Sequence, residues 1–483
     1  VVSPHLLTPR NTEVMTARPV RQKSYFSPDS LVLIHYDTTG THTVPQNYTF
    51  DPEIPDYVYS VARYLEDCYY VLSDSLGFNT PPLDDTLATE IDVYFVNYYN
   101  YYGQTFLEQQ IEPGVWTSYM TLNSDLENTS VFYTTGLEGL MVTCAHELFH
   151  VFQLGYKYRS SDLFYFEMSS VWFEEYMYPE VNDYHSYFNE YARRWNHVIN
   201  HNNLLYNNVG FNLYIDKRYS NPGDNIIKAV WEQMLTKTSL EAIRSVLDVR
   251  GSSFENALNN WGTAQVLCDP YNVHDFSYPF DDAQELSTIS FEEYSGNVLT
   301  SMNGEISLSS FPMTSYYKIQ NIPNELLLFE ADLSDNTSAN IICLNGSQSR
   351  VYTIGNGPIV IDGDQYSDYI ISIGSNASEA SATYSFTVIE SDIISSLYPN
   401  PFSSGQTLNM NYILTRDYTS GNLFLYDLKG RKIFSHALRT DKLSAGLHEL
   451  ALNLSLQSIS SGLYIIVFQA DDILLSKKVT FFK

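Results

Sequence analysis

Residues 140–154 read Leu140-Met141-Val142-Thr143-Cys144-Ala145-His146-Glu147-Leu148-Phe149-His150-Val151-Phe152-Gln153-Leu154. This stretch is largely apolar and has no glycine or proline, so it predicts a buried helix. His146 and His150 are four residues apart and therefore lie on one helix face. Two imidazoles placed in this way can bind one metal ion, and zinc prefers such nitrogen ligands. Glu147, beside the first histidine, can take a proton from a water at that metal.

A zinc site needs a third protein ligand, and two glutamates downstream can supply it. Glu167 and Glu174 lie on a second predicted helix, which a loop separates from His150. They are seven residues apart and share a helix face, so spacing alone does not choose between them. Glu175 points elsewhere. The alternative for Glu174 and Glu175 is a solvated helix end ahead of Pro179.

The composition of the 483 residues excludes several classes of protein. There are 56 Asp+Glu against 26 Lys+Arg, a net charge of -30, so the surface repels nucleic acids and anionic membranes. No apolar run reaches the roughly 18 residues of a membrane-spanning helix. The four cysteines have wide spacings that match no zinc-finger or redox motif, and they are expected to be buried thiols: Cys68, Cys144, Cys268 and Cys343.

The order of predicted elements suggests several domains. Residues 1–27 are polar and proline-containing and predict an extended arm. Strands are expected at 31–36, 91–96 and 116–122, and helices at 54–77 and over most of 137–265. After about residue 285, short alternating strands separated by turns predict β-structure only.

The two glutamates and the His146–His150 motif resemble the gluzincin metallopeptidases. Aminopeptidases of that type carry a segment of the form E-G-x-A-x-x-x-E whose first glutamate binds zinc. Glu167-Met168-Ser169-Ser170-Val171-Trp172-Phe173-Glu174 is similar to it, although Met168 and Val171 replace small residues. The resemblance implies that His146, His150 and Glu167 hold zinc, with Glu174 in support or as the alternative third ligand.

A second resemblance is to a little-characterised group of secreted bacterial metalloproteases. It covers most of residues 28–260 and includes Ile34-His35-Tyr36-Asp37-Thr38-Thr39-Gly40 and Ile54-Pro55-Asp56-Tyr57-Val58. Many members have an acidic loop before the second segment that suggests calcium, but here it is reduced to Asp51-Pro52-Glu53, and no calcium site is predicted. Gluzincins commonly stabilise the oxyanion with a downstream Tyr or His, and five residues are candidates: His185, His197, His201, Tyr206 and Tyr214.

The C-terminal 85 or so residues carry a third resemblance. They begin with Tyr398-Pro399-Asn400-Pro401-Phe402, contain Ser461-Gly462-Leu463-Tyr464, and end in a basic strand. This order resembles the type A sorting domain of the Bacteroidetes type IX secretion system. It implies recognition by the type IX secretion machinery, export across the outer membrane, and a location at the cell surface or in the medium.

These observations predict a multidomain chain. We expect an extended arm over 1–27, an α+β zincin-like metallopeptidase domain over 28–280, and two all-β, immunoglobulin-like sandwich domains over 285–392 and 395–483. The last of these is the sorting domain.

The expected function is that of a secreted zinc endopeptidase acting on protein or peptide substrates, with Glu147 as general base. The strand at 116–122 is expected to pair with an extended substrate. The alternative is a surface-binding or adhesive protein with a degenerate peptidase domain. Aminopeptidase activity is a weaker option, because no acidic groups that would hold a free α-amine are identified.

Overall fold

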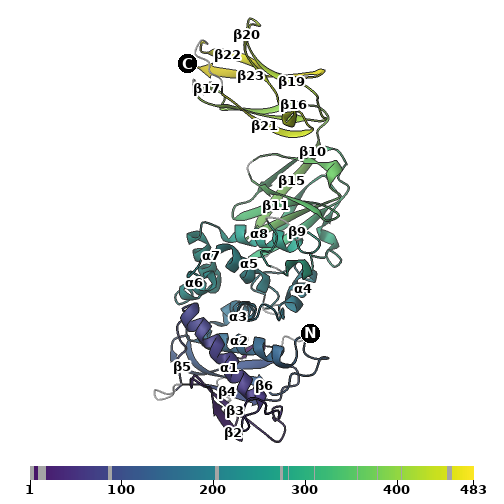
Figure 1. Ribbon diagram of the computed structural model, residues 1–483. Coiled ribbons are helices and arrows are strands. Elements are labelled where there is room, and N and C mark those ends of the chain that lie inside the picture. Colours follow the sequence, from purple (N-terminus) through teal and green to yellow (C-terminus); the bar gives the residue numbers. More distant parts are fainter. Residues whose placement is uncertain are drawn as a thin grey trace.

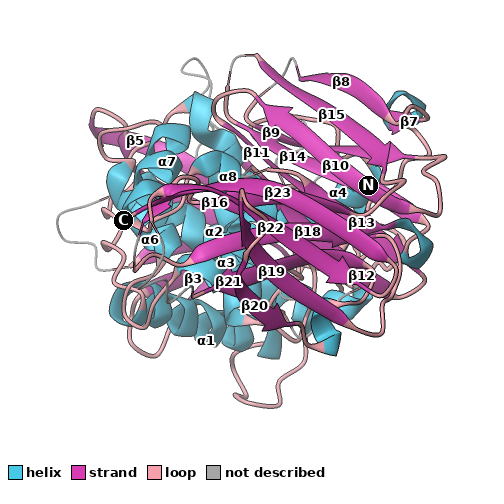
Figure 2. Cartoon of the chain, turned by 90° about the horizontal axis from the view of Figure 1, so that it is seen from above, coloured by secondary structure: helices cyan, strands magenta, loops and turns pink. Residues whose placement is uncertain are grey.

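A sheet covered by helices forms the N-terminal end of the molecule, followed by a helical layer and two β-units arranged along one axis (Figure 1). Seen along that axis, the strands of the β-units overlie the helices (Figure 2). No helix in the described ranges is long and apolar enough to cross a membrane. The computed structural model describes residues 5–8, 18–84, 90–201, 206–271, 276–280, 282–308, 311–355, 357–377, 379–403, 405–453 and 460–483.

The first sheet has six strands in the order β1-β5-β6-β4-β3-β2. Strands β3, β4 and β6 run parallel to one another, and β5 returns antiparallel to β6. The strands predicted at 31–36 and 91–96 are confirmed as β3 and β4. The strand bounds are β1 His5–Thr8, β2 Lys23–Phe26, β3 Val32–Tyr36, β4 Ile91–Val96, β5 Gly103–Glu112 and β6 Val115–Asn123.

The strand predicted at 116–122 is confirmed as β6, and the substrate-pairing role expected for it stays a prediction. Strand β5 pairs along one edge of β6, whereas β4 pairs with the other edge only from Met120 to Asn123. On this side of the sheet β1 is the edge strand, and it pairs with β5 from Gly103 to Phe106.

Two short strands, β1 and β2, lie within the predicted N-terminal arm. Strand β1 pairs with β5, and β2 pairs antiparallel with β3, so both contribute to the sheet. Residues 1–4 and 9–17 of the expected arm lie outside the described residues.

Two helices, α1 (Asp56–Tyr70) and α2 (Gly136–Leu154), pack against each other and against this sheet. Helix α1 follows Pro55 and continues into a π-helical turn, and Gly77 just beyond has a φ of +72° that favours glycine. Helix α2 is buried over nearly its whole length, which confirms the helix predicted from its uninterrupted apolar sequence.

Six further helices form the second layer. Helix α3 packs on α2, α5 on α3, and α8 on α5. The predicted capping box of Thr238 and Glu241 is present at the start of α7. The bounds are α3 Leu163–Met177, α4 His185–Arg193, α5 Val209–Tyr219, α6 Ile226–Gln233, α7 Ser239–Val249 and α8 Phe254–Val266.

The first β-unit consists of two sheets, ordered β13-β10-β15-β8 and β12-β11-β14-β9-β7. Helix α8 packs on the second sheet, and Tyr316, Ile342 and Ile370 belong to the same core as the helices. Packing therefore continues across the boundary predicted between 280 and 285. The bounds are β7 Val298–Leu299, β8 Asn303–Leu308, β9 Met313–Ile319, β10 Leu326–Leu333, β11 Thr337–Asn345, β12 Gln348–Ile354, β13 Ile359–Asp362, β14 Asp368–Ser375 and β15 Ala380–Val388.

The last unit has two sheets of its own, ordered β16-β18-β21 and β17-β23-β22-β19-β20. They enclose a separate apolar core that includes Tyr412, Phe468 and Phe481. All four cysteines of the chain are buried and free, as predicted. The bounds are β16 Ile393–Tyr398, β17 Phe402–Ser403, β18 Leu408–Leu414, β19 Gly421–Asp427, β20 Lys432–Ala437, β21 Gly446–Leu452, β22 Gly462–Ala470 and β23 Ile473–Phe482.

Candidate metal centre

Packing of α3 on α2 brings three potential metal ligands together. His146 and His150 face α3 from neighbouring turns of α2, and Glu167 faces them from the first turns of α3. The Glu167 Oε2 atom lies 3.2 Å from His146 Nε2 and 3.3 Å from His150 Nε2. One ligand atom from each residue lies within 4.8 Å of the others, and all three residues are buried.

The second ring nitrogen of each histidine is held by a buried side chain. His150 Nδ1 donates to Gln153 Oε1 at 2.7 Å, and His146 Nδ1 donates to Glu174 Oε1 at 2.5 Å. Both rings therefore present Nε2 toward Glu167. Apart from its 3.3 Å contact with Glu167 Oε2, His150 Nε2 is a buried atom without a hydrogen-bond partner among the described residues, as expected of a metal-ligating nitrogen.

The two glutamates that spacing could not separate have different positions. Glu167 touches the Nε2 side of the rings, whereas Glu174 binds the Nδ1 side of His146. The alternative of a solvated helix end is wrong for Glu174, which is only 2% exposed. Glu174 therefore orients a histidine instead of joining the three-residue cluster.

Glu147 lies against strand β5. Thr105 Oγ1 donates to Glu147 Oε2 at 2.7 Å. A Cβ atom at Gly103 would lie 2.8 Å from Glu147 Cγ and 2.9 Å from the backbone oxygen of Thr121. Glycine at this position thus allows β5 to approach Glu147 closely, and the threonine fixes the direction of the carboxylate.

The carboxyl groups around the histidines have strongly perturbed pKa values. Burial raises the pKa of Glu147, although the two histidines partly offset this effect. Burial and the nearby Asp183 raise the pKa of Glu174. Burial alone would raise the pKa of Glu167, but the imidazoles of His150 and His146 outweigh it and lower that pKa well below the usual value.

Burial also raises the pKa of Asp183, to about 6, and Thr134 Oγ1 donates a hydrogen bond to its carboxyl group. Three buried glutamates thus lie at the two histidines, with Asp183 near Glu174. Burial makes ionisation of these carboxyl groups costly, and a bound divalent cation would offset that cost.

Of the five candidates for oxyanion stabilisation, Tyr206 has a described contact with a ligand residue. Its ring centroid lies 6.0 Å from that of His146, and it stacks on Tyr187 at 5.3 Å. Tyr206 is therefore the candidate that is buried against a residue of the cluster.

The described contacts of the other four candidates are with residues outside the cluster. His185 binds Asp282, His197 binds the backbone oxygen of Arg194, His201 packs on His197, and Tyr214 packs on Arg218 and Tyr278.

Sequence reasoning did not assign roles to Gln153, Thr105, Gly103 or Asp183. Gln153 had a local signal, since it follows His150 by three residues on a buried helix face where a polar side chain needs a partner. The other three have none, because their contacts depend on how distant segments of the chain pack.

Comparison with known proteins identifies two families. Residues 20–322 match the profile of a family of unknown function, DUF6055, and residues 396–481 match the secretion system C-terminal sorting domain. The sorting domain directs the protein to the cell surface or the medium through the type IX secretion machinery. No metallopeptidase family is among these matches, and no curated protein matches the chain.

Solved structures with partial similarity include two glycosidases. The β-1,2-glucanase from Parabacteroides distasonis is 11% identical, covering 37% of this chain and 32% of that one, with a TM-score of 0.14. A β-glucuronidase from Bifidobacterium dentium is 9% identical, covering 35% and 39%, with a TM-score of 0.17. The chain thus spans about a third to two fifths of the length of these structures, and at such TM-scores they carry no argument about its fold or chemistry.

Proposed function

The chain belongs to DUF6055, a family of unknown function, and we propose from its candidate site that it is a secreted zinc-dependent peptidase with a zincin-like N-terminal domain. His146, His150 and Glu167 would hold the zinc ion, and Glu147 would be the general base. The substrates are proteins or peptides outside the cell, where the sorting domain delivers the enzyme.

The approach of Glu167 to the Nε2 atoms of both histidines carries this proposal. Zinc bonds of about 2.0–2.1 Å at tetrahedral angles put neighbouring ligand atoms about 3.3–3.4 Å apart. The carboxylate oxygen of Glu167 lies 3.2 and 3.3 Å from the two Nε2 atoms, which fits that geometry. Gln153 and Glu174 supply the outer hydrogen bonds that ligating histidines usually make.

Each nearby side chain then has a role in peptide hydrolysis. Bound zinc would polarise the scissile carbonyl and make water a better nucleophile. Glu147 would take a proton from a water held at the site and pass it to the leaving amine. Thr105 orients Glu147, and Tyr206, whose ring lies beside that of His146, would donate a hydrogen bond to the developing negative charge on the substrate oxygen.

Metal analysis and casein digestion test this function against the alternative of a degenerate surface-binding protein. A peptidase should contain about one zinc ion per chain and cleave casein, and a chelator should abolish the cleavage. A purified chain without bound zinc, and without casein cleavage after zinc is added, would contradict the proposal.

A further inference from the structure

Strand β1 occupies the outer edge of the first sheet. It pairs parallel with β5, with His5 opposite Gly103 and Thr8 opposite Phe106. A strand edge offers one row of backbone donors and acceptors, and a peptide that adds to a sheet uses such a row. Along these four residues, another extended segment cannot pair with β5 while β1 is in place.

This part of β5 is also the part that contacts the candidate metal centre. The backbone of Gly103 approaches the side chain of Glu147, and Thr105 donates to its carboxylate. Strand β1 contacts α3 as well, the helix that carries Glu167. It therefore lies against both β5 and α3, two of the elements that form the candidate metal centre.

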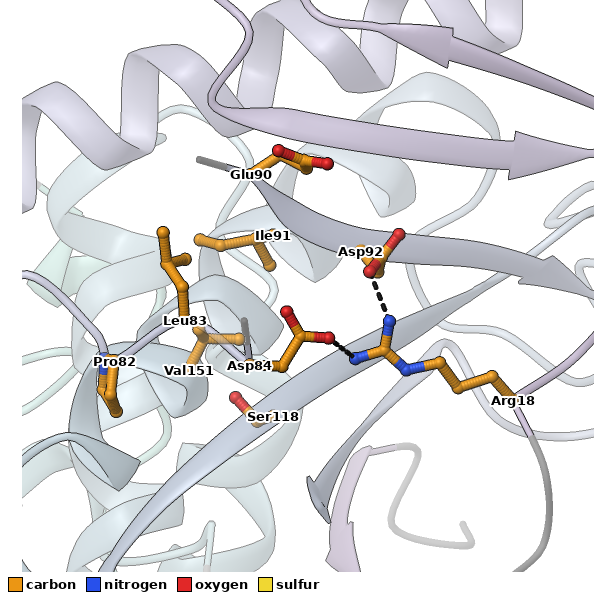
Figure 3. A pocket seen from close by; sticks show the side chains of 9 residues that line it. All are labelled: Arg18, Pro82, Leu83, Asp84, Glu90, Ile91, Asp92, Ser118 and Val151. Atoms are coloured by element: carbon orange, nitrogen blue, oxygen red, sulfur yellow. Dashed lines mark hydrogen bonds and ion pairs between the residues drawn. The ribbon is translucent and has the colours of Figure 1, made fainter. Parts of the chain in front are cut away.

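Arg18 attaches the chain to the first sheet shortly after β1, through hydrogen bonds and ion pairs with acidic side chains. Its Nε donates to Glu108 Oε1 at 2.8 Å, and its terminal nitrogens bind Asp84, Asp92 and Glu108. Figure 3 shows the guanidinium reaching Asp84 and Asp92 at one side of a small pocket. Its Cζ atom also lies over the ring of Tyr119, 5.4 Å from the centroid.

The anchor at Arg18 keeps β1 close to β5. Only the nine residues 9–17 join the strand to the anchor. A short tether gives an effective concentration on the order of millimolar, so a four-residue strand with weak affinity of its own can still occupy the edge.

We propose that residues 5–8 are a self-inhibitory segment, which occupies a peptide-binding edge on β5 and competes there with peptide ligands. The inference deepens the proposed function, because substrates of the peptidase would be the competing peptides. Loss of β1 from the edge, by displacement or by cleavage between β1 and Arg18, would open the site.

Replacing Leu6 and Leu7 together with proline in the full chain tests the proposal. Proline removes the backbone N–H groups of both residues, including any that bonds to β5, and the matched control, Leu6→Ala with Leu7→Ala, keeps them. A fluorescent synthetic peptide of residues 1–17 is titrated into each protein, and binding is followed by anisotropy. Zinc content and circular dichroism establish that each variant is folded.

The proline variant should bind the peptide with a dissociation constant about tenfold or more below that of the wild type, because the tethered competitor is gone. Arg18→Gln removes the ion pairs closest to β1 and leaves the next attachments at Arg21 and β2, so it lengthens the tether and should shift binding in the same direction by a smaller factor. Equal peptide binding by folded wild type, proline variant and Arg18→Gln would overturn the proposal.

Cleavage of a quenched fluorescent peptide separates this inference from the proposed function. Faster cleavage by the proline variant, slowed again by added 1–17 peptide, supports both. Tighter peptide binding without cleavage by any form supports the self-inhibitory segment and contradicts the peptidase.

Discussion

Replacing Gln153 with methionine tests whether the hydrogen bond to His150 prepares the metal site. Gln153 Oε1 accepts from His150 Nδ1 at 2.7 Å, and its Nε2 donates to the backbone oxygen of Phe166 at 3.0 Å, with Ser169 and Ser170 also in reach. Methionine has a similar length and no such groups. His150 Nδ1 then has only Ser170 Oγ, at 3.2 Å.

The loss of an outer hydrogen bond to a ligating histidine typically lowers metal affinity about 10–100-fold, or about 1.4–2.8 kcal/mol. Leaving buried polar groups without partners costs about 1–3 kcal/mol of stability in addition. Zinc affinity is measured by competition with a chelating dye, and stability by thermal unfolding. Gln153→Glu keeps the accepting oxygen and should retain most of the affinity.

The matched control is Gln233→Met on the exposed side of α6, which should change neither quantity. If Gln153→Met folds and binds zinc within about twofold of the wild type, the orienting role of Gln153 is refuted.

Three further predictions concern the surrounding residues. Glu167→Ala should lower zinc affinity much more than Glu174→Ala, because of the two glutamates only Glu167 faces both Nε2 atoms. Competition with a chelating dye measures both affinities, and the reverse order would make Glu174 the ligand. Tyr206→Phe should keep zinc but lower kcat about 10²–10³-fold through loss of an oxyanion donor, and an unchanged kcat would exclude that role. Burial raises the pKa of Asp183 to about 6, so the wild type should lose about 3 kcal/mol of stability as pH rises from about 4 through 6. Asp183→Asn should remove this loss of stability, which is measured by thermal unfolding at a series of pH values. If the variant loses as much stability over the same pH range as the wild type, the titration belongs to another group.

The sequence predicted those elements whose signals are local. The apolar run around His146 specifies a buried helix, and the alternation around Ile34 specifies a strand, because each pattern lies within one element. The pairing of the two histidines on one face followed from helical spacing alone.

What could not be predicted depends on contacts between distant segments. Glu167 and Glu174 share a helix face, and only the way α3 packs on α2 gives them different sides of His146. The interior place of β6 follows from strand order, which no single strand encodes. The pairing of β1 with β5 joins residues about a hundred positions apart, and the sequence of 1–27 has no periodicity that would have revealed it.

The central claim is that Glu147 is the base of a zinc peptidase and not a ligand. Its most direct test is zinc content and peptide cleavage of Glu147→Gln beside the wild type, each also with the Leu6 and Leu7 prolines so that the edge of β5 is open. The account predicts about one zinc ion per chain in all forms and a loss of roughly a hundredfold or more in cleavage for Glu147→Gln. Full cleavage by Glu147→Gln with zinc bound would contradict it.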